Sequence, residues 1–96
     1  MDMVVGDIVS GIFTTTSVAH YFQPAASVEV MVTWCGGRGA QTYTGLSNGV
    51  TDSMSAIADN AEFNSGSNTR LAINNTNYYV GYAVTSPPSY AGIQIK

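Results

Sequence analysis

The chain has 96 residues, enough for a single domain, and 45% of them are hydrophobic, which excludes an intrinsically disordered chain. Only 9% are charged, the net charge is −3, and three cations are too few to neutralise nucleic-acid phosphates. We therefore expect one domain over residues 1–96 that binds no nucleic acid. Leu is scarce whereas Val, Ile and Thr are frequent, and this composition favours strands over helices.

No apolar run reaches the roughly 18–20 residues of a membrane-spanning helix, so the sequence predicts no membrane segment. The first residues lack the basic stretch of a secretory signal. Cys35 is the only cysteine, which excludes an internal disulfide and a multi-cysteine metal site. We expect a protein that is made in a reducing cytoplasm.

The first third of the chain predicts several strands. Residues 4–16 are rich in β-branched side chains, and residues 17–22 alternate in polarity. Residues 27–34 are the clearest strand, because apolar side chains recur at every second position and would share one buried face. We expect Trp34 to anchor the core at the end of this strand, and the glycine-rich residues 35–39 to form a flexible turn.

The middle of the chain is less regular. Residues 41–46 predict a strand, and residues 47–49 predict a turn whose Asn-Gly pair tolerates positive φ. Residues 51–63 fit either a short helix that Asp52 caps or a strand, and we favour irregular or strand structure. Residues 64–68 have the composition of a loop.

The last third predicts strands at 69–74, 78–85 and 90–96. A turn at 74–77 separates the first two, and the prolines of 86–89 predict a rigid connection before the third. About seven or eight short antiparallel strands predict an all-β fold, a single small β-sandwich of jelly-roll type. The expected core is Val28, Val30, Val32, Trp34, Leu71, Ile73, Ile93 and Ile95.

His20, the only histidine, is the one candidate for a catalytic base. The residues of a Ser-His-Asp triad are present in the sequence, since His20 could combine with Ser17 or Ser53 and with Asp7 or Asp52. Hydroxyls are so frequent here that any histidine would have one nearby, and no nucleophile-elbow motif is present. We therefore favour His20 as a polar strand residue and a candidate for a subunit contact. We expect no enzyme activity and keep a small hydrolase as a minor alternative.

The other chemical signals favour structural interpretations. Cys35 follows an expected core residue, which favours a buried thiol over a nucleophile. Loop carboxylates and amides between residues 52 and 68 lack the spacing of a calcium loop. The segment 36–39 lacks the Lys and the Ser or Thr of a phosphate-binding loop. We expect no metal and no cofactor.

Tyrosines are the remaining candidates for a functional surface. Aromatic side chains on a polar β-surface stack on sugars or fill protein interfaces. If residues 78–85 form a strand, either Tyr78 or Tyr79 must face outward. The candidate interface residues are Tyr43, Tyr78, Tyr79, Tyr82, Tyr90 and His20. Burial of the tyrosines in the core is an equally open interpretation.

Three segments together resemble the small virion structural proteins of tailed bacteriophages. They are VAHYFQPAASVEVMVT at 18–33, TRLAINNTNY at 69–78 and YAGIQIK at 90–96, and they occur in the order of that group. The resemblance implies a β-sandwich subunit that works in many copies on the particle, as a capsid decoration (cement) protein or as a head- or tail-fibre knob. It carries over no catalytic residue.

Two functional hypotheses follow. The first is a decoration protein on the virion surface, a homo-oligomer with the trimer as first choice, which binds the major capsid protein or another virion protein. The second is a fibre domain that binds host surface glycans through exposed tyrosines. Scarcity of charge favours self-association, because unpaired charges are costly to bury in an interface.

Overall fold

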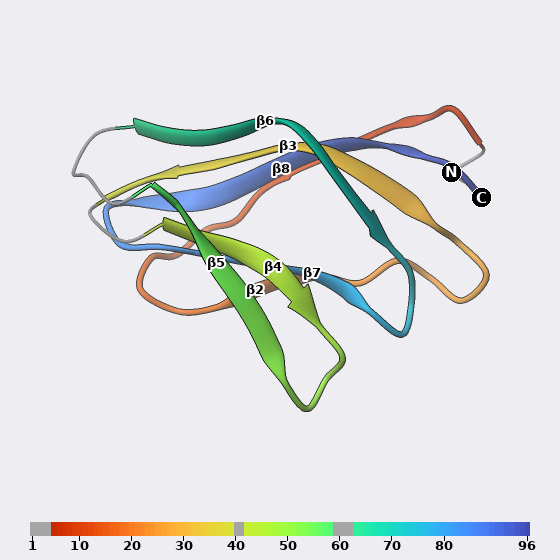
Figure 1. Cartoon of the computed structure of the whole chain (residues 1–96), viewed down its shortest axis with the longest axis horizontal. Helices are drawn as coiled ribbons and strands as arrows, with labels where there is room; N and C mark the ends of the chain where they lie inside the picture. Colours follow the sequence, from red (N-terminus) through yellow and green to blue (C-terminus); the bar gives the residue numbers. More distant parts are fainter. Residues whose placement is uncertain (1–4, 40–41, 59–62) are drawn as a thin grey trace.

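The computed structural model describes residues 5–39, 42–58 and 63–96 (Figure 1). Within these ranges eight strands form two antiparallel sheets of four strands, and no helix is present. The two sheets are packed as the layers of a sandwich, so the predicted all-β fold is confirmed.

We name the sheets A and B. Sheet A has the order β1 (Ile8–Ile12), β8 (Ser86–Gln94), β3 (Val30–Arg38) and β6 (Phe63–Ile73). Sheet B has the order β2 (His20–Phe22), β7 (Tyr78–Ala83), β4 (Thr42–Ser47) and β5 (Asp52–Ala58). Pairs are nested along the chain, with β1 on β8, β2 on β7, β3 on β6 and β4 on β5. This nesting is the topology of a jelly roll.

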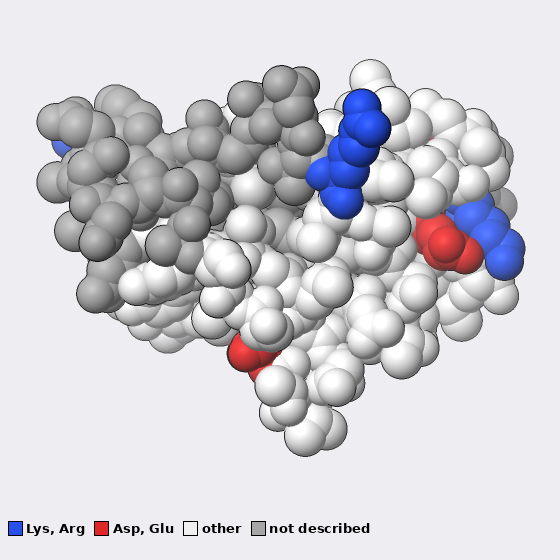
Figure 2. Space-filling model, viewed as in Figure 1, with Lys and Arg blue, Asp and Glu red and all other residues white. Residues whose placement is uncertain are grey.

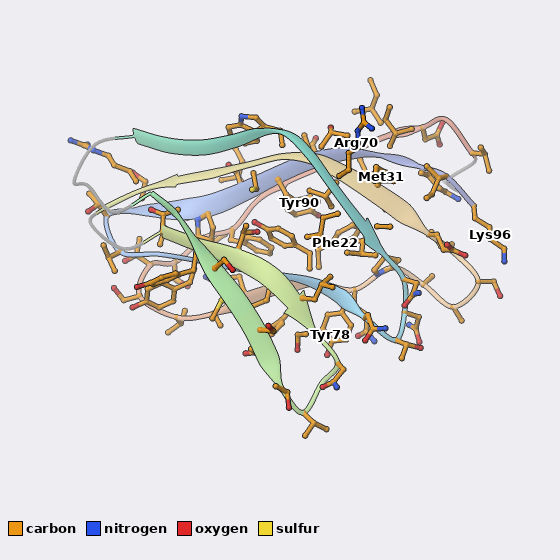
Figure 3. All side chains as sticks on the ribbon, in the orientation of Figure 1. Phe22, Met31, Arg70, Tyr78, Tyr90 and Lys96 are labelled. Atoms are coloured by element: carbon orange, nitrogen blue, oxygen red, sulfur yellow. The ribbon has the colours of Figure 1, made fainter. Side chains whose placement is uncertain are left out.

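Aromatic rings fill the space between the sheets. Tyr90 of sheet A lies at its centre, with ring centroids 4.7 Å from Phe22 and 5.3 Å from Tyr79 (Figure 3). Phe13 stacks on this group and lies 5.6 Å from Tyr90. Around the rings, Val30, Val32, Ile73 and Cys35 are buried, and Val28 and Leu71 pack against them. These positions confirm five of the predicted core residues and the buried thiol.

Trp34 was expected in the core, but 38% of its surface is exposed, so that prediction is wrong. The reason is a β-bulge: the pairing of β3 with both neighbours shifts register between Val32 and Trp34. An extra residue at this point reverses which side chains face inward. Val30 and Val32 therefore face the core before the bulge, and Cys35 does so after it.

Ile93 and Ile95 were also expected in the core, and they are 44% and 42% exposed. In β8 the inward positions are the even-numbered residues, as Tyr90 and Gln94 show. Tyr90 fills the central space, so the isoleucines on the odd positions face away from sheet B. The period-2 pattern of this strand was correct, and the assignment of its faces was wrong.

Three predicted connections are parts of strands instead. Residues 35–38 continue β3, residues 64–68 lie within β6, and residues 86–89 begin β8. Pro87 and Pro88 are tolerated because they lie beyond the end of β1, whose Ile12 pairs with Ser89, and opposite an irregularity in the pairing with β3. Residues 52–58 form β5, as the favoured interpretation allowed, while 59–62 lie outside the described residues.

Gly11 provides the clearance that Tyr90 needs. A Cβ atom at Gly11 would lie 2.8–3.0 Å from the Tyr90 ring and hydroxyl. We expect Gly11→Ala to lower the free energy of unfolding by about 1–3 kcal/mol, because the overpacked ring must move. Urea titration measures the loss. Combining Gly11→Ala with Tyr90→Phe, which removes the crowding hydroxyl, should recover part of it, and strictly additive losses would contradict this contact.

Candidate interaction surfaces

The outer surface of β1, β8 and β3 carries several large apolar side chains, although the outer face of an antiparallel sheet is normally polar. Register places Ile8, Ile93 and Met31 in one row across β1, β8 and β3. On the same face, two residues further along β1 and β8, Trp34 lies in the next cross-strand row, and Ile12 lies in the row after that. Ile8 and Ile12 are 83% and 80% exposed. We call these five residues the apolar face.

A hollow lies beside Trp34 on this face. It has a volume of about 560 Å³ and is open to solvent. Small side chains create it, because Trp34 is paired with Ala91, and Ala91 with Ser10. Its lining residues are Ser10, Gly11, Ile12, Trp34, Ser89, Tyr90 and Ala91. The apolar face therefore combines protruding side chains with a depression that can receive one.

Few charges interrupt the described part of the face that Figure 2 shows. At one end of sheet A, Lys96 and Glu29 form an ion pair with an N–O distance of 3.6 Å. Arg70 of β6 projects from the outer side of the sheet (Figure 3). The ion pair is exposed to solvent, so it contributes at most about 1 kcal/mol to stability. Lys96 and Glu29 neutralise each other within the chain, so this end of the sheet does not require a charged partner.

The outer surface of sheet B carries tyrosines, and we call this surface the tyrosine face. Tyr43 of β4 is paired with Tyr82 of β7, and their ring centroids are 5.9 Å apart. Tyr78 of β7 and Tyr21 of β2 meet edge to face at 6.1 Å. The four rings come from three adjacent strands whose outward positions they occupy. They form a surface that can stack on a planar or apolar ligand.

A hydrogen bond crosses the tyrosine face. The Tyr21 hydroxyl donates to Oδ2 of Asp52 over 2.6 Å, which ties β2 at one edge of sheet B to β5 at the other. Hydrogen bonds from Ser47 and Tyr21 lower the pKa of the Asp52 carboxyl, so it is ionised at neutral pH. The bond to Asp52 raises the pKa of Tyr21. The tyrosine face thus has one fixed negative charge.

The predicted interface residues divide between this surface and the core. Tyr43, Tyr78 and Tyr82 lie together on the tyrosine face, where each is half-buried. Tyr79 and Tyr90 point between the sheets, so neither is displayed outward, and the core interpretation holds for both. Sequence reasoning did not select Tyr21, whose signal was its position between His20 and Phe22 in an alternating segment. That alternation turns Tyr21 outward if its two neighbours face the core.

His20 lies at the side of the aromatic core. Its Nε2 atom is 2.9 Å from both the hydroxyl and the carbonyl oxygen of Thr15, and its ring stacks on Phe13 at 4.8 Å. Asp52, one of the two carboxylates considered for a catalytic triad, contacts Tyr21 and Ser47 instead. These contacts hold the imidazole as part of the packing.

Two other kinds of site are absent from the part of the chain that the structure describes. Among the described residues, no group of three or more His, Cys, Asp or Glu side chains is arranged to hold a metal ion. No helix in that part of the chain is long and apolar enough to cross a membrane.

Comparison with protein-family models, with curated proteins and with solved structures finds no match to this chain. The residues and the geometry of the two outer faces are therefore the basis for the function.

Proposed function

We propose that this protein is a virion structural subunit of a tailed bacteriophage, most consistently a capsid decoration protein that works in many copies. The observation that carries the proposal is the apolar face. Ile8 and Ile12 are more than three-quarters exposed in the single chain. Apolar residues grouped on one face of a sheet are typical of a surface that a partner covers.

The fold and the composition support the same function. Jelly rolls are recurrent in viral capsid and lectin domains, which is an argument by analogy since a fold does not determine a function. A surface rich in Ser, Thr and Asn and poor in charge packs against neighbouring subunits without burying unpaired ions. Many weak contacts of this kind, repeated over a closed shell, act together and stabilise the particle.

The proposal predicts a mechanical phenotype. Shells that lack the protein should release their DNA at a lower temperature than complete shells, because a subunit that binds only the assembled shell stabilises it by mass action. Host adsorption should be unchanged. Thermal DNA-release curves and adsorption assays on particles with and without the protein measure both properties, and adding purified protein back should restore the release temperature.

A second candidate function rests on the tyrosine face. Four tyrosine rings with an ionised carboxylate beside them, at Asp52, are suited to stack on sugar rings and accept hydrogen bonds from sugar hydroxyls. A fibre or knob domain that binds host glycans would use such a surface. In the same assays this function predicts lost adsorption with unaltered DNA release, a result that would reject the decoration protein and favour the fibre domain.

A further inference from the structure

We infer that the apolar face pairs with the same face of a second copy of this chain about a two-fold axis. This inference rests on the proposed function only in that both require a partner on sheet A. It names that partner as the chain itself and sheet A as the surface of contact.

The size of the face fits a weak dimer. The apolar face spans β1, β8 and β3, and three strands about 4.8 Å apart with the nine residues of β3 at about 3.3 Å each give a flat footprint of about 400 Å². Protruding side chains add to the accessible area of such a footprint. Weak and transient interfaces bury less than about 600 Å² from each partner, and the corrugated apolar face lies in that range.

The shape of the face is complementary to itself. A two-fold contact brings one patch against an identical patch, so protrusions and depressions must occur on the same surface. Ile8, Ile93 and Met31 make a row of larger side chains, and the hollow of about 560 Å³ lies beside them and next to Trp34. A two-fold axis that lies between the two faces, parallel to the sheets and across their strands, sets the row of one copy over the hollow of the other.

The charges favour a second copy over a partner of opposite charge. The Glu29–Lys96 ion pair at the end of the sheet is satisfied within one chain. Arg70 is the cation that projects on the described outer side of this sheet, too little charge to recognise a polyanion. Contact through aliphatic side chains and Trp34 is what remains, and another copy supplies it.

Trp34 makes the inference directly measurable, because it is the only tryptophan in the chain and lies in the proposed contact. Sedimentation velocity over a concentration series should show a monomer–dimer equilibrium. Over the same series, tryptophan emission should move to shorter wavelength as the indole leaves water. Coincident curves are the expected result, and a trimer would contradict a two-fold contact.

A matched pair of variants tests the location. Ile12→Asp places a carboxylate on the face and should weaken dimerisation by on the order of 100-fold or more, because each copy buries an unpaired charge. Ile12 is 80% exposed, so the fold should persist. Val50→Asp is the control, since Val50 is 92% exposed in the turn between β4 and β5. It should dimerise as wild type does; equal effects of both variants would overturn the inference.

Shell binding, measured separately, distinguishes failure of this inference from failure of the proposed function. If the chain stays monomeric in solution but Trp34 becomes shielded when shells are added, the inference of a second copy is overturned. A virion protein is then the partner that covers the apolar face. A chain that dimerises with Trp34 shielded but does not bind shells would support the inference and reject the decoration function. Dimerisation with Trp34 still in water would place the contact elsewhere and overturn the inference.

Discussion

Tyr90→Ala should lower the free energy of unfolding by about 3–5 kcal/mol, whereas Trp34→Ala should lower it by no more than about 2 kcal/mol, although tryptophan is the larger residue. Tyr90 is 9% exposed and contacts the rings of Phe13, Phe22 and Tyr79 between the sheets. Removing its ring leaves a cavity at the centre of the core. Trp34 is 38% exposed and lies on the outer face, where truncation leaves no closed cavity.

Urea unfolding followed by circular dichroism, at protein concentrations low enough to keep the chain monomeric, measures both losses. Tyr90→Phe is the control, because it keeps the ring and should cost much less than the alanine variant. A loss for Trp34→Ala as large as that for Tyr90→Ala would contradict the bulge in β3 and return Trp34 to the core.

Raising the pH from about 10 to about 12 should destabilise the protein through Tyr79. Burial raises the pKa of Tyr79 to about 12 in the folded chain, against 10.0 for an unperturbed tyrosine. Below pH 10 the phenol is protonated in both states and its contribution to stability is constant. Between the two values the unfolded chain releases the proton and the folded chain retains it, so stability falls with pH. Two pKa units correspond to about 2.7 kcal/mol.

The measurement compares free energies of unfolding at pH 8 and pH 11.5 for wild type and for Tyr79→Phe. The phenylalanine variant keeps the ring and lacks the titrating group, so its stability should fall less over this range. Burial also raises the pKa of Tyr90, so some alkaline loss should persist in the variant. Identical losses in the two proteins would refute the role of Tyr79.

The fold could be predicted largely because strand signals are local. Alternation in residues 27–34 marked β3, and the Asn-Gly turn separated β4 from β5. Two of the misassigned segments, 64–68 and 86–89, have loop composition but long-range partners. Residues 64–67 pair with β3, and Pro88 accepts a hydrogen bond from the backbone N–H of Phe13. Such pairing depends on the topology, which local composition does not encode.

The candidate surfaces were harder to predict, because they depend on which side of each strand faces the core. Alternation identifies two sides without saying which is buried. In β7 the sequence required one of Tyr78 and Tyr79 to face outward, and the structure turns Tyr79 inward, where its hydroxyl lies close to the space over Gly81. In β8 the larger Tyr90 took the inner side, and Ile93 was left on the outer side. Packing between the sheets decided both cases.

The bulge at Thr33 has a consequence for how this surface could be kept in a lineage. Thr33 lies between two stretches of β3 that present opposite sets of side chains to the core, Val30 and Val32 before it and Cys35 after it. Loss of its codon would remove the extra residue and leave a regular strand in which the valines and Cys35 still face inward and Trp34 still faces outward. The strand can therefore gain or lose one residue at this point in a single genetic event while the side chains on both of its faces are kept.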